Sequence, residues 1–424
     1  MRAMAAVDAQ LLWMSAIVPN DQFLLYGFDG APGSIEAAVA EVRRRAEDCP
    51  ELRLRAVDDS RLRYPGWESG GISDDQLVVH AGRAVDWQGC LDTVIGLTRL
   101  DATRMAWCVH VFPEVFGVPA AVGVGSVVVV QISHALGDGH RSAELAAALL
   151  GRPGKPVPVG APERGFLPWR AVIAGREHRR LQRAIGAGLI DPPPAPRPEL
   201  SVNAGPRRSA AARTLLLDRA RLSGRTVTVG VLSAVADALG GLLAGRGEDI
   251  SRLGAEVPMA IGGSRRAHNN FRNVAVDLHP ELAPWDRAER IAGQLAAHRR
   301  RGDHPAARAS VAALEAVPAA VLRWGVGRFD PGERWPTVSG HTVVSSVDRG
   351  PADLIFGDRP VVLTAGLPAL SPMMGLTHGV HGIGGIVAVS VHADPAVVDV
   401  EDYLDRLRHA LGAARSPRSP REQT

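Results

Sequence analysis

The residues best suited to chemistry are a histidine, an aspartate and a glycine that follow an apolar run. Residues 127–140 read VVVVQISHALGDGH, so the run leads to His134, with Asp138 and Gly139 shortly after it. A neutral imidazole, with an ordinary pKa of about 6.5, is a suitable general base at neutral pH. Asp138 can bond to its own backbone or to a nearby arginine and so hold the turn rigid. The pattern predicts a proton acceptor displayed at the end of a strand.

The same spacing also has a purely structural interpretation. A histidine before a turn is commonly a capped or solvated side chain, and His-x-x-x-Asp-Gly is short enough to occur by chance. The residues around His134 alone leave both interpretations open, a plain turn and a catalytic base.

A buried strand is expected to hold His134 in place. The run Val127–Ile132 lacks polar alternation, so both faces of this strand are expected to be covered. Strands and helices alternate through the first 150 residues, as they do in an α/β or α+β sandwich. The predicted strands cover 23–28, 52–57, 76–80, 107–112 and 121–133. The predicted helices cover 34–43, 91–97 and 141–150.

The second half of the chain repeats this mixture of elements. Its predicted strands cover 213–217, 254–260, 273–278, 342–346, 361–363 and 385–392. Its predicted helices cover 228–244, 285–301 and 400–411. Proline-rich stretches around one basic helix, 167–189, mark a linker. We expect an amino-terminal half at 1–150, a linker at 151–212, a carboxy-terminal half at 213–415 and a disordered tail at 416–424.

Composition limits the class of protein. The 424 residues are 46% hydrophobic and 22% charged, which allows an ordinary globular core. A net charge of +3 argues against a nucleic-acid partner. The only lysine, Lys155, lies in a Pro/Gly stretch and is a poor Schiff-base residue. Cys49, Cys90 and Cys108 lack metal-ligand spacing and are expected to be reduced thiols.

No signal-like segment opens the sequence. The longest apolar run, 118–130, is interrupted and too short to span a bilayer. We expect a cytoplasmic protein that is soluble or at most peripheral to a membrane.

Residues 133–139 resemble the His-His-x-x-x-Asp-Gly motif of the CoA-dependent acyltransferase superfamily, which includes condensation domains of peptide synthetases. Four further segments are similar, in order and spacing, to the bacterial wax ester synthase/diacylglycerol acyltransferase family. They are Val7-Asp-Ala9 before an apolar run, Leu100-Asp-Ala-Thr-Arg-Met-Ala-Trp107, residues 253–259 with 268–278, and residues 343–347 with 385–394. The chain therefore resembles a diverged member of that family along most of its length.

The resemblance implies two chloramphenicol-acetyltransferase-like halves that form a pseudo-dimer around a tunnel. His134 would take a proton from an acceptor hydroxyl or amine as that group attacks an acyl thioester. Asp138 would be structural, paired with an arginine, and Gly139 would permit a tight turn. Ser345 and Ser346 would lie near the crossover, opposite His134. No metal and no tightly bound cofactor is implied, because CoA or the pantetheine of a carrier protein is a co-substrate.

The resemblance also implies partners and further site residues. Acyl-CoA and an alcohol are the expected small molecules. An acyl carrier protein and a membrane or lipid-droplet surface are further partners. The expected substrate-binding residues, besides the two serines, are Ser133, Trp107, Asn269 and Asn270.

Four departures mark divergence from the family pattern. Ser133 stands where the motif has its first histidine, and Met105-Ala106 replaces a proline and leucine. The turn 346–351 reads SVDRGP, unlike the family's Asn-Val-Pro-Gly-Pro. The arginine expected after residues 257–259 is missing, so three others compete for Asp138: Arg265, Arg266 and Arg272.

Three functions remain open at this point. The first is an O-acyltransferase that joins an acyl-CoA to an alcohol, of wax ester or acylglycerol type. The second is transfer from a carrier protein to an amine or polyketide hydroxyl. The third is a degenerate binding homologue, which the altered motif neighbours favour and the intact His134, Asp138 and Gly139 oppose.

Two histidines invite a metal site. His378 and His381 lie in a glycine-rich stretch that we expect to be a loop, without acidic or cysteine partners nearby. No metal site is predicted, and the alternative is that both histidines line the tunnel.

Overall fold

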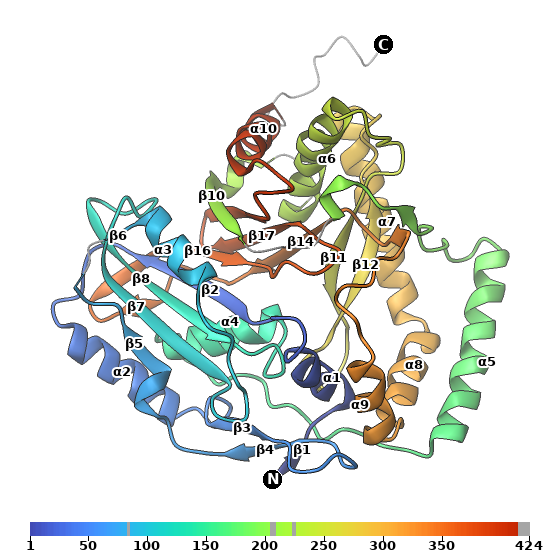
Figure 1. The fold of residues 1–424 in the computed structure, drawn as a ribbon, viewed down its shortest axis with the longest axis horizontal. Helices are drawn as coiled ribbons and strands as arrows, with labels where there is room; N and C mark the ends of the chain where they lie inside the picture. The colour runs from blue at the N-terminus through green and yellow to red at the C-terminus, as the bar shows by residue number, and fades with distance from the viewer. Residues whose placement is uncertain (83–84, 204–208, 223–225, 414–424) are drawn as a thin grey trace.

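The computed structural model describes residues 1–82, 85–203, 209–222 and 226–413. Two β-sheets lie next to each other, each with helices against it (Figure 1). The predicted α/β fold of two halves is confirmed. The predicted tail at 416–424 lies outside the described residues.

The first half begins with a short strand and a helix. Its elements are β1 (Arg2–Ala3), α1 (Ala6–Met14), β2 (Gln22–Phe28), α2 (Ile35–Glu47), β3 (Leu54–Val57), β4 (Gly66–Ser69), the single turn η1 (Asp74–Gln76), β5 (Leu77–Val79), β6 (Val85–Asp86), α3 (Trp87–Ile95), β7 (Trp107–Phe116), β8 (Val124–Ile132) and α4 (Gly139–Leu149).

The linker and the second half follow. Their elements are α5 (Leu167–Gly186), β9 (Arg197–Pro198), η2 (Ser201–Asn203), β10 (Ala211–Asp218), η3 (Arg219–Arg221), α6 (Val227–Gly245), β11 (Gly254–Ala260), β12 (Phe271–Asp277), α7 (Pro284–Asp303), α8 (Pro305–Glu315), α9 (Ala319–Gly327), β13 (Thr337–Val338), β14 (Thr342–Asp348), β15 (Ile355–Phe356), β16 (Arg359–Leu367), β17 (Leu376–Ile383), β18 (Ile386–Ala393) and α10 (Val400–Ala413).

One strand pair crosses from the second half into the first sheet. The first sheet has the order β15-β16-β2-β8-β7-β5, and the second has β10-β18-β17-β14-β11-β12. After β14 the chain therefore leaves its own sheet, pairs β16 antiparallel to β2, and returns as β17. We propose 1–150, 151–212 and 213–415 as the division of the chain, with 355–367 completing the first sheet.

Strand β8 has both faces covered, as its sequence predicts. Val128, Val130 and Ile132 belong to the core of the first half. Val127 and Val129 point the other way, into a cluster that joins the two halves. Packing on both faces therefore fixes the strand, and the turn that carries His134 starts from this fixed position.

The glycine-rich stretch that we expected to be a loop is the central strand β17, so that prediction is wrong. β17 pairs with β14 and β18 in the second sheet. A Cβ on Gly379 would overlap the carbonyl oxygen of Gly366 on β16. The glycines mark the close approach of the crossing strand and not a flexible segment.

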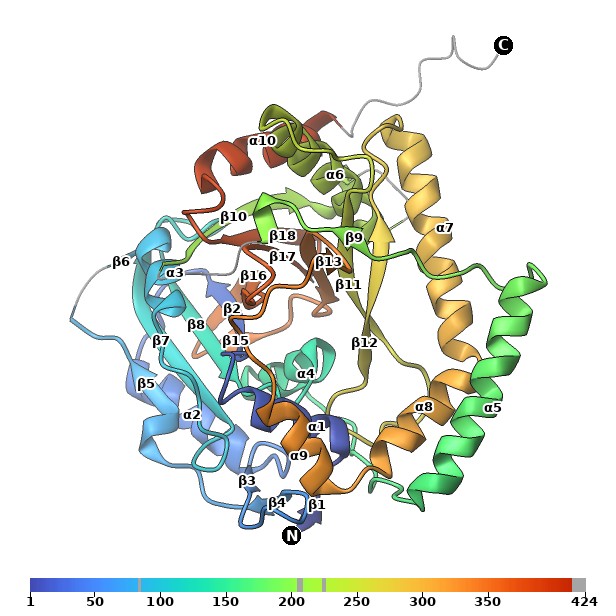
Figure 2. The same ribbon diagram turned by 45° about the vertical axis from the view of Figure 1, so that its right-hand side comes forward.

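Helix α6 is long and apolar enough to cross a membrane by composition, but 72% of that window is buried inside the protein. It packs against α7 and α10 (Figure 2). Its position agrees with the helix predicted at 228–244. Helices α1, α8 and α9 were not predicted. Within α7, Arg287 is buried and bonds to Asp237 at 2.6 Å.

Candidate active site

The imidazole of His134 is held by an asparagine from the other half. Its Nδ1 lies 2.9 Å from Oδ1 of Asn269, and the Nδ2 of Asn269 donates to the His134 carbonyl at 2.7 Å. The ring of Phe271 stacks on the imidazole, with centroids 5.5 Å apart. Asn269 and Phe271 lie just before and at the start of β12, so the two halves together fix the orientation of the histidine.

The hydrogen bonds of Asn269 determine which nitrogen of His134 carries the proton. The Nδ2 of Asn269 already donates to the His134 carbonyl and, at 2.9 Å, to Oδ1 of Asp8. Its oxygen must therefore accept, so Nδ1 of His134 is the donor. The lone pair is on Nε2, which has no hydrogen-bond partner within the described part of the chain. This is the arrangement that a general base requires.

Asp8 fixes Asn269 from the opposite side. It is fully buried in α1 and accepts from the backbone N–H groups of Asn269, at 2.9 Å, and His268, at 2.8 Å, as well as from the Asn269 side chain. Burial outweighs these three bonds and raises the pKa of Asp8 to about 7. Sequence analysis did not single out Asp8 as a site residue. The signal that was present is an acid within an otherwise apolar helix.

The environment of His134 favours the neutral imidazole. Burial lowers its pKa from the ordinary 6.5, and the bond to Asn269 and the charge of Asp138 offset only part of that effect. At neutral pH the ring is therefore unprotonated and ready to accept a proton.

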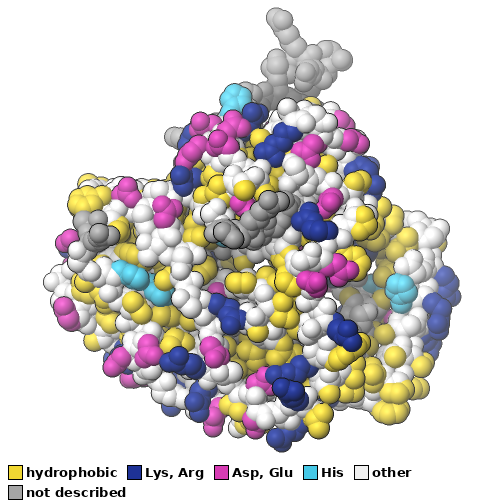
Figure 3. Space-filling model, viewed as in Figure 1, with side chains coloured by type: hydrophobic (Ala, Val, Ile, Leu, Met, Phe, Trp, Pro, Cys, Tyr) yellow, Lys and Arg dark blue, Asp and Glu magenta, His cyan; other side chains and the backbone are white. Residues whose placement is uncertain are grey.

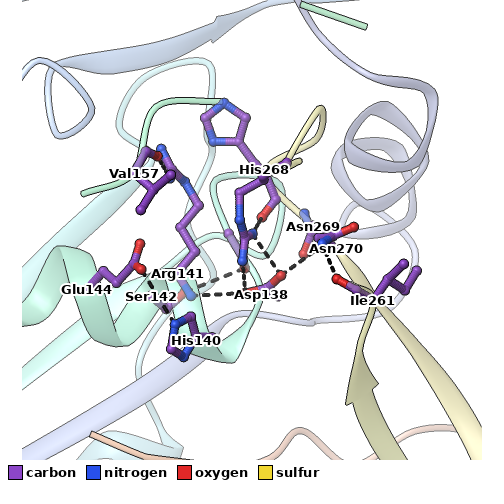
Figure 4. A network of polar contacts seen from close by, with 12 residues as sticks. Asp138, His140, Arg141, Ser142, Glu144, Val157, Ile261, His268, Asn269 and Asn270 are labelled. Carbon is purple, nitrogen blue, oxygen red and sulfur yellow. Dashed lines mark hydrogen bonds and ion pairs between the residues drawn. The ribbon is translucent and has the colours of Figure 1, made fainter. Parts of the chain in front are cut away.

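Asp138 is the centre of a separate network that joins the halves (Figure 4). It caps α4 by accepting from the N–H of Arg141 at 2.9 Å, and it accepts from the N–H of Asn270 at 2.8 Å. Arg265 is its ion-pair partner, with Nη1 2.9 Å from Oδ2. Burial acts to raise the pKa of Asp138, but the bonds from Arg141, Arg265 and Asn270 together lower it. The lowered pKa keeps Asp138 charged at neutral pH, and its bonds link α4 to the segment before β12.

The structure selects one of the three arginines considered for Asp138. Arg266 pairs instead with Glu163, and Arg272 donates to the carbonyl of His298. The side chain of Asn270 donates to the Ile261 carbonyl at 2.6 Å, which links Asn270 to the end of β11. The two neighbouring asparagines therefore have different partners. The side chain of Asn269 bonds to His134, and the backbone N–H of Asn270 bonds to Asp138.

The reason for a glycine at 139 differs from the expected one. Gly139 is the first residue of α4, and neither it nor Gly137 has a positive φ, so no special turn conformation is required. A Cβ on Gly139 would lie 3.1 Å from Cγ2 of Val347 on β14. Glycine fits here because the two halves approach each other closely.

The two predicted serines lie on opposite faces of β14. Ser345 shares its face with Val347, beside the start of α4, because side chains alternate along a strand. Ser346 faces α6, where its hydroxyl accepts from that of Thr228 at 2.9 Å, and it lines a cavity of about 440 Å³.

Trp107 and Ser133 are buried rather than open to a substrate. The indole of Trp107 is fully buried in the first core and donates to the Leu52 carbonyl at 2.6 Å. The prediction that it contacts substrate is corrected, because the start of β7 turns it inward. Ser133 is buried as well, and its backbone N–H donates to the Ala106 carbonyl at 2.9 Å.

His378 is also a core residue and not a tunnel residue. It hydrogen-bonds with Thr342 and Tyr403, at 2.9 and 2.8 Å, and burial lowers its pKa to about 4. His381 is buried next to Gly366. Within the described residues no three acidic, histidine or cysteine side chains form a metal-binding group.

A larger cavity, of about 780 Å³, lies where the two halves meet. Its walls are mostly apolar and come from both halves, including Phe23, Leu97, Leu370 and His392. Gln22, which precedes Phe23, donates its side-chain N–H to the carbonyl of Gly137 in the His134 turn. Strand β2 thus begins between this cavity, which Phe23 lines, and the His134 turn, which Gln22 contacts.

Replacing Asp138 with asparagine is expected to lower the free energy of unfolding by about 2 kcal/mol at neutral pH, because the charged bond to Arg265 is lost. The folded-state pKa of Asp138 is depressed, so its contribution is present above the unfolded value of 3.8 and is lost as pH falls through the folded value. Urea unfolding of both proteins across pH measures this difference. A gap that persists unchanged in strong acid would contradict the assigned charge.

No protein-family model and no curated protein sequence matches the chain. Solved structures match it over almost its whole length. The wax ester synthase/diacylglycerol acyltransferase from Marinobacter aquaeolei VT8 is 16% identical, with a TM-score of 0.60 over 97% of this chain and 98% of that one. A variant of the starter condensation domain of rhizomide synthetase in complex with C8-CoA is 13% identical, with a TM-score of 0.58 over 98% and 94%. Another variant of that domain, with C8-CoA and Leu-SNAC, is 13% identical, with a TM-score of 0.57 over 100% and 96%.

These likenesses define the class of fold. The chain has the two-halved architecture shared by condensation domains and CoA-dependent acyltransferases, as the sequence predicts. Within that class it shares the fold of the Marinobacter wax ester synthase/diacylglycerol acyltransferase, in a sequence that has diverged far from it.

Proposed function

We propose that the protein is an O-acyltransferase that transfers an acyl group from acyl-CoA to an alcohol, with His134 as the general base. The observation that carries this proposal is the imidazole fixed at Nδ1 by Asn269 with the lone pair of Nε2 unoccupied. The shared fold supports acyl transfer as the reaction class, and the C8-CoA bound to a condensation domain supports an acyl-CoA donor.

In the proposed reaction both substrates are bound at once. Nε2 of His134 takes the hydroxyl proton while the alcohol oxygen attacks the thioester carbonyl. The carbon–sulfur bond then breaks, and the imidazolium returns the proton to the leaving thiolate. No acyl-enzyme is needed, so the protein's contribution is a positioned base and two positioned reactants.

We propose the apolar cavity of about 780 Å³ as the space for the acyl chain or an apolar acceptor. Its mostly apolar walls and its position where the two halves meet support this assignment. Ser346 and the smaller, more polar cavity beside it are proposed as a second substrate contact.

A second candidate is acyl transfer to an amine, with a carrier protein as the donor. Its amine acceptor is supported by Leu-SNAC, an amine-bearing thioester bound beside C8-CoA in a condensation domain of the same fold. The two candidates use the same base and differ in acceptor and donor.

Thiol release from acyl-CoAs of increasing chain length, with alcohol, diacylglycerol and amine acceptors, tests the proposal. We expect release that depends on an alcohol and an ester product by mass spectrometry. An amide product would support the second candidate. No release from acyl-CoA or from a loaded carrier protein, in a folded protein, would contradict both and leave a binding homologue.

The acid limb of the rate should lie below the ordinary histidine pKa. Because burial lowers the pKa of His134 below 6.5, the base stays unprotonated as pH falls to 6.5, and kcat/KM should fall only under that value. A profile of kcat/KM against pH with a non-ionising alcohol measures this. A midpoint above 6.5 would show that the imidazole is not in the buried, neutral state described.

A further inference from the structure

Large apolar side chains are exposed around the amino-terminal end of α5. Phe166 is 73% exposed, and Trp169 of α5 and Trp324 of α9 are each 64% exposed. Val172 of α5 and Val321 of α9 are also exposed. A surface patch of this kind commonly marks an interaction site in a folded protein.

The segments that carry these side chains meet at one place. Arg164, just before α5, pairs with Glu315 at the end of α8 at 3.4 Å, and its guanidinium lies 3.9 Å from the ring centre of Tyr64. The hydroxyl of Tyr64 donates at 2.7 Å to the carbonyl of Val317, between α8 and α9. The start of α5 and the start of α9 therefore belong to the same end of the molecule (Figure 2).

Along the exposed face of α5, apolar side chains near the amino-terminal end are followed by arginines toward the carboxy-terminal end. Trp169, Val172, Arg176, Arg179 and Arg183 are spaced by three or four residues, so they form one stripe along the helix. All five are exposed, whereas α5 packs against α8 with its opposite side. On the flank of Figure 3 where α5 and α8 lie, hydrophobic and basic side chains are neighbours.

The three arginines of this stripe have no carboxylate partner within the described residues. The only acid of α5, Glu177, is largely buried and pairs with Arg180. The stripe therefore presents positive charge that no carboxylate in the described part of the chain neutralises. It is complementary to a surface that carries many negative charges.

The neighbouring helices add exposed apolar side chains beside this stripe, namely Val311 of α8 and Val321 and Trp324 of α9. The two helices are bent by 94° at the break between them. Exposed apolar and aromatic side chains next to a cationic stripe match the headgroup boundary of an anionic bilayer, which offers both an apolar layer and negative charge. This combination favours lipid over an acidic protein as the partner.

We propose that the face formed by α5 and α9, namely Phe166, Trp169, Val172, Arg176, Arg179, Arg183, Val321 and Trp324, docks on an anionic phospholipid surface. The aromatic end enters the headgroup boundary, and the arginine stripe binds the phosphate groups. This inference concerns the location of the protein and does not depend on the proposed reaction. Helix α9 packs on α1, which carries Asp8, so a docked membrane would lie beside an element of the active site.

Co-sedimentation of the full chain with vesicles tests the proposal. Vesicles of phosphatidylcholine alone are compared with vesicles that also contain phosphatidylglycerol. We expect binding to the anionic vesicles that weakens with salt. The triple variant Arg176→Glu/Arg179→Glu/Arg183→Glu should bind about 100-fold more weakly, and Trp169→Ala/Trp324→Ala about tenfold more weakly.

Matched controls separate this face from general charge and hydrophobicity. Arg44→Glu/Arg406→Glu/Arg408→Glu changes the net charge equally at other exposed helices, and Trp335→Ala removes an exposed tryptophan elsewhere. Both should bind vesicles within about twofold of the wild type, with all variants folded by circular dichroism. Absence of wild-type binding, equal losses in the controls, or binding of an acidic acyl carrier protein to this face in place of vesicles would each overturn the proposal.

Discussion

Replacing His134 with alanine is expected to lower kcat by about a hundred- to ten-thousand-fold, because the positioned general base is removed. The thermal midpoint should change little. His134 lies after the end of β8, and the core packing of that strand does not depend on the imidazole. The measurement is acceptor-dependent thiol release with a saturating acyl-CoA, on wild type and variant at equal concentration.

His140→Ala is the matched control for this change. His140 lies in the first turn of α4, is exposed, and approaches Glu144 at 3.5 Å. It should retain kcat within about twofold. If the His134 variant folds and keeps its rate, the imidazole has no role in proton transfer and the proposed mechanism is wrong.

Asn269→Ala should lower kcat by about a hundredfold while His134 itself is intact. The change removes the only side-chain bond that orients the imidazole and fixes its tautomer, and misoriented bases lose much of their rate. The bond from Asn269 also acts to raise the pKa of His134. The acid limb of kcat/KM should therefore move to lower pH in the variant.

That pH shift distinguishes orientation from a general loss of structure, which would expose the imidazole and move the profile to higher pH instead. Asn273→Ala, an exposed asparagine on the same strand, serves as the control and should match the wild type. An unshifted profile together with a normal kcat would show that Asn269 does not position the base. Asp8→Asn should lower kcat less than Asn269→Ala does. The asparagine has one accepting oxygen in place of two, so part of the hydrogen bonding that holds the segment of Asn269 is lost.

Local features of the site were predictable from the sequence. The valine run specified a strand buried on both faces, and the spacing from His134 to Asp138 placed an aspartate where it caps the next helix. Each of these features depends on residues a few positions apart. The resemblance to a known family then predicted the two-halved fold, which the solved structures share.

Long-range partners could not be derived in this way. Asp8 and Asn269 are 261 positions apart, and no local pattern indicates that they meet. The choice of Arg265 over its neighbours likewise depends on how the second half packs on the first. The prediction of a loop at β17 failed because glycine is common both in flexible loops and where two backbones approach closely. In β17 the second reason applies.

The crossing strands β15 and β16 also determine when the first sheet can be completed during synthesis. Until residues 355–367 have left the ribosome, β2 pairs only with β8 and presents its other edge unpaired. An open edge beside apolar side chains such as Phe23 and Leu25 is a template for wrong pairing. We therefore expect the first sheet to close only after most of the second half has been made, which leaves the amino-terminal half with an open edge during synthesis.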